Sequence, residues 1–398
     1  MDDLHNPINR IQSYPVSAYI SVQGGGAKGG WQAGVLEELL SSGLIKPTSI
    51  GGSSAGAINA VLFEQAFRTG STNYMSAYWL GRRRLLLKHL FRFSAMKLPL
   101  RVFAIVRSIL SSRVGLSDPI RHPPLLNFEE FKTVVTTGLT TGPASSSLHL
   151  YLFGCPVDGD TPKSFDPNHP YTFALRKGDS DLEMMTIDDR TIRCSLEDAV
   201  TCSCCLPLIA PLVVDGKGYS DGGIFSNLPI DFIFTQGSLG ARIGIFIMGT
   251  PLSDLAKDGD PISHKTLHML NKIKDGLESA SKTFSSKPSS SAATVPSYCA
   301  TAWLIIAPKK KLSAGLISGF FSNRTMNDAI QQGRMEGRAF CDALKNAAVG
   351  QQREPLRGYH LPEMIFPTQK MVPPLFSEWW ISFINRKWKN KSMKSDVS

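Results

Sequence analysis

The sequence predicts an α/β domain with a mainly parallel central sheet, and three observations lead to this fold class. Segments with strand-like and helix-like patterns alternate along most of the chain. Glycine-rich turns join the first two strands to the helices that follow them. The chain has 398 residues, 42% of them hydrophobic and 19% charged, which supports a sizeable packed core and argues against a disordered or fibrous chain.

The predicted elements follow one another in the order that such a fold requires. An apolar strand at 18–22 leads into a helix whose apolar side chains recur at helical spacing, namely Trp31, Val35, Leu36, Leu39 and Leu40. A short strand at 48–51 then precedes an apolar helix at 55–67. Later runs with strand length and β-branched or aromatic content lie at 148–153, 243–248 and 302–306. Helical patterns separate them, at about 126–135, 196–205, 264–281 and 325–345.

Two segments account for the net charge of +10. Residues 82–113 contain nine basic residues and no acidic one, and residues 386–394 contain five more against none. Both segments mix these charges with large apolar side chains, which favours an anionic membrane surface as partner and argues against nucleic acid. The first is predicted to form a basic, apolar helical cap, and the second belongs to a basic aromatic tail that starts at about 372.

The composition also bears on location. The longest charge-free apolar stretch, 201–214, is far shorter than the roughly 18 to 20 residues of a membrane-spanning helix. The N-terminus opens with two aspartates and lacks the apolar core of a signal peptide. Seven scattered cysteines favour a reducing compartment. We therefore expect a cytoplasmic protein that associates peripherally with membranes.

The strongest local signal is a GxSxG sequence, Gly52 to Gly56, between a predicted strand and a predicted helix. The spacing makes Ser54 the candidate nucleophile, because the flanking glycines permit the sharp turn that lifts its hydroxyl out of the sheet. The N-terminus of the following helix favours developing negative charge. Ser53 lacks the flanking glycine pair. GxSxG also arises in small-residue loops that have no catalytic role, so the assignment depends on its context.

A second glycine-rich loop follows the first strand and consists of Gly24, Gly25, Gly26, Ala27, Lys28 and Gly29. Its backbone amides can converge on an anion, so the loop is a candidate oxyanion hole. The same letters satisfy the dinucleotide-binding pattern GxGxxG, but no acidic residue follows at the position, about 20 residues on, that would bind a ribose. A P-loop fails because the residues on either side of Lys28 do not fit that motif.

The candidate general base is Asp221, within the segment Tyr219-Ser220-Asp221-Gly222-Gly223. Its carboxylate, at a turn among small residues, can contact the Ser54 hydroxyl and take its proton during attack. Partial burial would raise its basicity. Taken alone, the triplet Asp-Gly-Gly more often marks a tight turn.

The three motifs in this order resemble the patatin-like phospholipase family, whose members combine a glycine-rich oxyanion loop, GxSxG and Asp-Gly-Gly or Asp-Gly-Ala. The resemblance runs from about residue 17 to residue 347. It includes the small-residue stretch 201–207, which ends in proline, the triplet Asn227-Leu228-Pro229, and the late helix around Gly333.

This resemblance implies a three-layer α/β/α fold and a Ser54–Asp221 dyad without histidine, with amides near Gly25 and Gly26 as the oxyanion hole. It implies hydrolysis of fatty-acyl esters in phospholipids or other lipids, of the phospholipase A or lysophospholipase type, with no metal and no cofactor. The implied organisation is an N-terminal segment 1–16, a hydrolase domain 17–347 that includes the cap and a flexible Ser-rich insertion at 279–297, and an extension 348–398.

The sequence departs from the family pattern in two places. Lys28 stands where the family usually has arginine, and it lacks the planar fork that holds two oxygens together. A cysteine cluster lies where alanine or serine is more common, at Cys202, Cys204 and Cys205. We expect these thiols to pack as small apolar side chains, since no second CxxC or histidine set completes a zinc site.

Three histidines follow Asp221 and test the dyad, since a triad in hydrolase order would need one of them: His264, His268 and His360. We expect them to be solvated or to lie in the core.

The candidate membrane-binding residues are Arg92, Phe93, Lys97, Arg101 and Phe103 in the cap and Trp379, Trp380 and Trp388 in the tail. A helical lid over the site is the alternative for the cap. The alternative function is a catalytically inactive peripheral membrane-binding protein that retains the fold.

Overall fold

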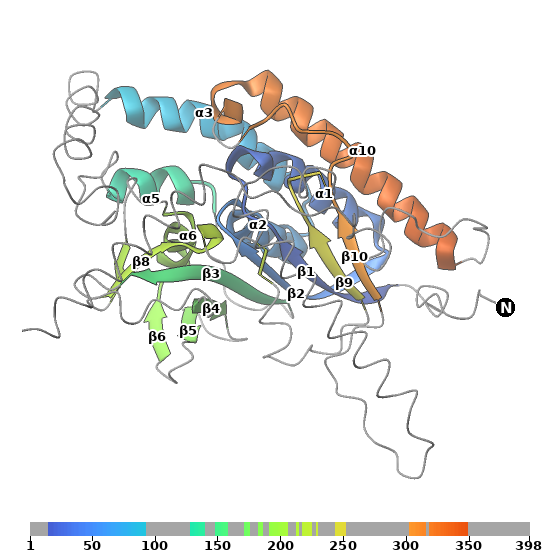
Figure 1. Ribbon diagram of the computed structural model, residues 1–398, viewed down its shortest axis with the longest axis horizontal. Helices are drawn as coiled ribbons and strands as arrows, with labels where there is room; N and C mark the ends of the chain where they lie inside the picture. Colours follow the sequence, from blue (N-terminus) through green and yellow to red (C-terminus); the bar gives the residue numbers. More distant parts are fainter. Residues whose placement is uncertain are drawn as a thin grey trace, which may run out of the picture.

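The computed structural model in Figure 1 describes twelve stretches of the chain. They are residues 15–92, 128–139, 148–157, 171–175, 182–185, 191–205, 212–214, 217–224, 228–229, 243–251, 302–315 and 318–348. The predicted helix at 264–281, the Ser-rich insertion at 279–297 and the tail from 372 all lie outside these stretches.

The centre of the fold is one ten-stranded sheet, ordered β10-β9-β1-β2-β3-β4-β5-β6, with β8 paired to β3 and β7 paired to β8. Five neighbouring strands run parallel: β10 (Ala302–Ile306), β9 (Ile243–Ile247), β1 (Val16–Val22), β2 (Ile45–Ser53) and β3 (His149–Val157). The antiparallel strands are β4 (Tyr171–Leu175), β5 (Leu182–Met185), β6 (Thr191–Cys194), β7 (Leu212–Val214) and β8 (Lys217–Asp221).

Helices connect and cover the parallel strands. The described helices are α1 (Gly29–Ser42), α2 (Ala55–Thr69), α3 (Tyr74–Arg92), α5 (Phe128–Thr136), α6 (Leu196–Cys204) and α10 (Asn323–Ala348). Short 3-10 turns lie at η3 (Gly26–Lys28), η6 (Gly222–Ile224) and η7 (Ser318–Phe321). The alternation of parallel strands and helices confirms the predicted fold class, and β10 has the bounds that the sequence predicts.

Helix α1 is buried on almost every side, because α2, α3 and α10 all contact it. Figure 1 shows α10 running along α1 and α3. Glycines let the two long helices touch backbone to backbone. A Cβ atom on Gly34 would lie 2.2 Å from the carbonyl oxygen of Ile330, and one on Gly333 would lie 2.0 Å from that of Trp31. No larger residue fits at either position.

The basic segment 82–113 begins inside α3, which starts at Tyr74. Arg82, counted with the basic residues of this segment, is buried rather than presented to a surface. Its guanidinium lies over the ring of Tyr78, 3.6 Å from the centroid, and donates to the carbonyl oxygens of Val134 and Thr137 at the end of α5. Arg82 therefore ties α3 to α5.

None of the described helices is both long and apolar enough to span a bilayer.

Candidate active site

Ser54 occupies the junction between β2 and α2, as the GxSxG motif predicts. Its backbone has φ 55° and ψ −124°, and it is the single non-glycine residue with positive φ in the described stretches. This conformation is strained for a residue with a side chain and turns its hydroxyl away from the sheet at the N-terminus of α2. The sharp turn thus falls on the serine itself.

The glycines of the motif are required by close packing. A Cβ atom on Gly52 would lie 2.1 Å from the carbonyl oxygen of Gly56, and one on Gly56 would lie 2.2 Å from that of Val22. Strand β2, helix α2 and strand β1 therefore meet with no room for side chains. From the sequence these glycines are expected to permit the sharp turn, whereas in the structure they permit the backbones to touch.

Asp221 ends strand β8, which pairs antiparallel with β3 so that Asp221 lies opposite Gly154. Its amide donates to the carbonyl oxygen of Cys205 over 2.7 Å. The Ser54 hydroxyl donates to Oδ2 of Asp221 over 2.7 Å, and the amide of Gly223 donates to Oδ1 over 2.6 Å. Two residues 167 positions apart in sequence thus come into direct contact.

Burial controls the acidity of this carboxyl group. Asp221 is only 1% exposed, and desolvation raises its pKa from 3.8 to about 7. The hydrogen bonds from Ser54 and Gly223 act in the opposite direction but do not overcome the burial. A carboxyl group with a pKa near neutrality is a far better proton acceptor than an exposed aspartate.

The C-terminal turn of α6 holds the peptide group of Ser54, the candidate nucleophile. The amide of Ser54 donates to Oγ of Ser203 over 3.0 Å, and the Ser203 hydroxyl donates to the carbonyl oxygen of Phe153 over 2.6 Å. The Cys204 thiol donates to the carbonyl oxygen of Ser54 over 3.3 Å. Burial, followed by the charge of Asp221, raises the pKa of the Cys204 thiol, so it stays a donor. The sequence pattern predicts for neither Ser203 nor Cys204 that it contacts the peptide group of Ser54.

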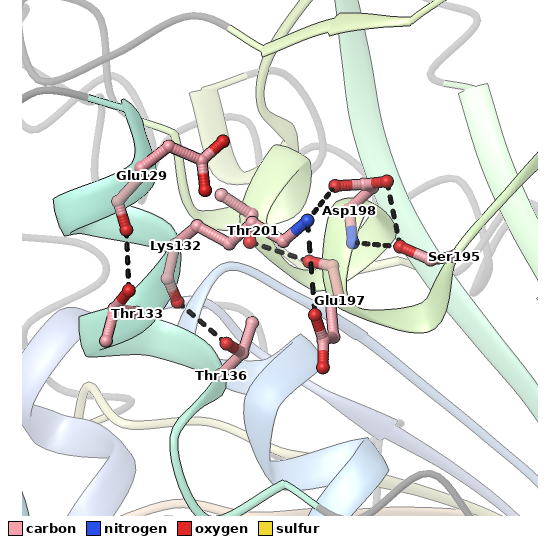
Figure 2. Close-up of polar contacts among 8 residues, drawn as sticks. All are labelled: Glu129, Lys132, Thr133, Thr136, Ser195, Glu197, Asp198 and Thr201. Carbon is pink, nitrogen blue, oxygen red and sulfur yellow. Dashed lines mark hydrogen bonds and ion pairs between the residues drawn. The ribbon is translucent and has the colours of Figure 1, made fainter.

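Figure 2 shows what holds the other end of α6. The ammonium group of Lys132, on α5, lies 2.7 Å from Oδ1 of Asp198 and 4.0 Å from a carboxylate oxygen of Glu197. Ser195 caps the helix, because its Oγ accepts from the Asp198 amide. These contacts fix the start of the helix whose last turn contacts Ser54.

The glycine-rich loop follows β1, whose Val22 pairs with Gly52 of the GxSxG motif, so the loop begins close to Ser54. Within it, the amide of Lys28 donates to the carbonyl oxygen of Gly25, and the amide of Gly29 donates to those of Gly26 and Ala27. No described residue accepts a hydrogen bond from the amides of residues 24–27. These four amides are therefore the part of the predicted loop that can receive an anion.

A buried polar network supports this loop. The indole of Trp79 donates to Oδ1 of Asn59, and the Asn59 amide donates to Oε1 of Gln32. Gln32 in turn donates to the carbonyl oxygen of Gln23, whose Oε1 accepts from the amide of Gly249. All four side chains are buried. Asn59, the polar side chain in the otherwise apolar run 55–63, is the sequence signal for this network.

Lys28 also anchors the loop. Its ammonium group donates to Oγ1 of Thr250 over 3.1 Å, just beyond β9. Its side chain also packs against Gly25 and Gly249, where an added Cβ would lie 3.3 Å and 3.0 Å from the Cβ of Lys28. The Lys28 ammonium group thus joins the glycine-rich loop to the segment after β9, without the planar fork that an arginine would offer at this position.

The other predicted site residues divide into two groups. Cys202, Cys204 and Cys205 are buried, as expected for small packing residues, and the described part of the chain contains no cluster of potential metal ligands. Outside it lie the three later histidines and the side chains of all candidate membrane-binding residues: His264, His268, His360, Arg92, Phe93, Lys97, Arg101, Phe103, Trp379, Trp380 and Trp388.

Fold and site together define an α/β protein with a serine–aspartate pair at one edge of a parallel sheet. The family model of patatin-like phospholipases matches residues 20–233, more than half of the chain. The chain therefore belongs to the patatin-like phospholipase family. A sequence search among curated proteins finds no significant match.

Several solved structures are similar at low identity. VipD from Legionella pneumophila aligns over 83% of this chain and 68% of its own, with 13% identity and a TM-score of 0.34. Human GIVD cytosolic phospholipase A2 aligns over 85% and 61%, with 12% identity and a TM-score of 0.44. The type III effector ExoU aligns over 83% and 54%, with 15% identity and a TM-score of 0.28. The chain thus spans less than two thirds of the human enzyme and of ExoU.

Proposed function

We propose that the protein is a serine lipid acyl hydrolase, of the phospholipase A or lysophospholipase type, that cleaves fatty-acyl esters. The observation that carries this proposal is the 2.7 Å hydrogen bond from the Ser54 hydroxyl to a buried carboxyl group with a pKa of about 7. Membership of a lipase family supports the choice of lipid esters as substrates.

The first step is attack by Oγ of Ser54 on the acyl carbonyl carbon while Oδ2 of Asp221 takes the hydroxyl proton. The C–O double bond becomes a single bond to a negatively charged oxygen. Collapse of this intermediate breaks the ester bond, and Asp221 returns the proton to the departing alcohol. The acyl group is then bonded to Ser54.

The second step repeats the first with water. Asp221 accepts a proton from water, the resulting hydroxide attacks the acyl-enzyme, and Ser54 leaves with the proton that Asp221 returns. In both steps the negatively charged oxygen lies toward the N-terminus of α2 and toward the amides of residues 24–27, from which no described residue accepts a hydrogen bond. The sequence of steps uses only protein groups and water.

The test is labelling with a fluorophosphonate probe, followed by intact mass and peptide mapping. We expect one label on Ser54 in the wild type and none in Ser54→Ala. Ser53→Ala is the matched control, because the Ser53 hydroxyl is buried without a hydrogen-bond partner among the described residues. Lipid panels then identify the ester that is cleaved.

The alternative is a membrane-binding protein that has lost turnover. It predicts a folded chain that binds vesicles of anionic lipid but takes up no probe at Ser54. Labelling that persists in Ser54→Ala would also contradict the proposal, because the reactive group would then lie elsewhere.

A further inference from the structure

The strands of the parallel sheet are aligned so that their ends can be compared directly. One row of paired residues crosses four strands, from β10 through β9 and β1 to β2: Ile306, Ile247, Val22 and Gly52. Residues that follow this row leave the sheet at the same edge, since parallel strands end together. Ser54 comes two residues after Gly52, just beyond the end of β2. Lys309 comes three residues after Ile306, just beyond the end of β10.

The connection from β10 to α10 presents three consecutive lysines at this edge, Lys309, Lys310 and Lys311. All three are exposed, and none forms an ion pair with another described residue. The start of the connection is fixed, because the amide of Lys309 donates to Oε1 of Glu336 over 3.2 Å. The Trp31 indole donates to the other oxygen of the same carboxylate. The lysines therefore extend from an anchored backbone.

The same connection ends in η7, which lies against the glycine-rich loop. A Cβ atom on Gly319 would lie 2.7 Å from the Cβ of Ala27. The ring of Phe320 stacks on Trp79, with centroids 6.0 Å apart. The next side chain, Phe321, is 46% exposed. A large aromatic side chain is thus exposed close to the candidate oxyanion loop.

We propose that Lys309, Lys310, Lys311 and Phe321 form a membrane-contact surface that binds the head groups of anionic phospholipids beside the active site. Three exposed cations that form no ion pair with a described residue match the negative charge of such a surface, and an exposed aromatic ring suits the boundary between head groups and acyl chains. Three strand spacings separate β10 from β2, roughly 14 Å, so lipids next to the one being cleaved would meet the lysines. This inference rests on the proposed function only for the identity of the cleaved lipid.

The test compares two double variants of the full chain that remove equal charge. Lys310→Gln with Lys311→Gln alters the proposed surface. Lys46→Gln with Lys345→Gln alters two exposed lysines, one near the start of β2, at the opposite edge of the sheet, and one in the last turn of α10. Co-sedimentation is measured with vesicles of phosphatidylcholine alone and with vesicles of equal parts phosphatidylcholine and phosphatidylserine.

The expected result is a loss of about fivefold in affinity for each lysine removed at the proposed surface, and so about thirtyfold for the pair, on the anionic vesicles alone. The control pair should lose less than about threefold. Equal losses in both pairs would mean that only net charge matters, and no loss in the first pair would mean that the surface does not touch lipid. Either outcome overturns the inference.

A second measurement needs no variant. In wild-type protein, anionic vesicles should slow the acetylation of Lys310 and Lys311 by an amine-reactive reagent but leave that of Lys46 unchanged. Unaltered acetylation of the first two, on vesicles that do bind the chain, contradicts the proposal. Both measurements report binding and not cleavage, so a wild-type chain that binds vesicles but never cleaves lipid would refute the proposed function and not this one. A Ser54→Ala background keeps lipid cleavage from altering the vesicles during the measurements.

Discussion

Replacing Asp221 with asparagine is expected to make the protein more stable at about pH 8 while it abolishes labelling of Ser54. Burial raises the pKa of this carboxyl group from 3.8 to about 7, a shift of about three units. At about 1.4 kcal/mol per unit, keeping the carboxylate ionised in the folded state costs about 4 kcal/mol above pH 7. Asparagine has nearly the same shape and carries no charge.

The sign of the pH dependence follows from proton binding. Between pH 3.8 and about 7 the folded protein binds this proton more tightly than the unfolded chain does, so stability falls as the pH rises through that range. Below it both states are protonated and the cost vanishes. Asparagine removes the cost but can lose the bond from the Gly223 amide, at about 1 to 2 kcal/mol. The net gain should be about 2 to 3 kcal/mol at about pH 8.

The assay is urea unfolding of the wild type and Asp221→Asn at about pH 8 and about pH 5, with the difference taken from the midpoints. The advantage of the variant should shrink or reverse at the lower pH. Asp328→Asn, on an exposed position of α10, is the control, because its carboxylate is hydrated in both states. A variant no more stable than wild type at about pH 8, or one whose advantage is independent of pH, would refute the reasoning.

Three further predictions concern the same structure. The rate of fluorophosphonate labelling should rise with pH and reach half its maximum at about pH 7, because only ionised Asp221 accepts the Ser54 proton; stopped-time labelling across a pH series checks this. Ser203→Ala should slow labelling by about ten- to a hundredfold, because the Ser203 hydroxyl oxygen accepts from the backbone amide of Ser54 and holds it in place. The pH midpoint should not move, because the hydroxyl proton of Ser54 goes to Asp221 and not to Ser203. Arg82→Lys should lower stability by about 2 kcal/mol in thermal unfolding, because lysine cannot reach both carbonyl oxygens at the end of α5.

The sequence predicted the parallel strands and the two catalytic candidates because these depend on local patterns. The run at 302–306 has a strand's length and composition, and GxSxG stands between a strand-like and a helix-like segment, the local context that its turn requires. The contact between Ser54 and Asp221 followed from the resemblance of the whole motif set. The proposed roles of both residues remain predictions.

The supporting contacts were not predictable in the same way. Ser203 and Cys204 lie in a small-residue helix whose composition suggests only close packing, and their partner is about 150 residues away. Arg82 belongs to a strongly basic segment, yet it is buried because the carbonyl groups at the end of another helix provide its acceptors. In each case the decisive partner comes from tertiary structure, which sequence pattern does not specify.

The glycine contacts between α1 and α10 have a consequence for synthesis of the chain. The surface of α1 at Gly34 is covered by the backbone around Ile330, about 300 residues later, and nothing larger than glycine can replace that contact. While a ribosome is still translating the intervening region, α1 and the turn at Ser54 have no complete core to join. We therefore expect α1 to lack part of its packing until α10 has emerged. The segment 20–233, which matches the family model, ends before α10 and so lacks the helix that covers this face of α1.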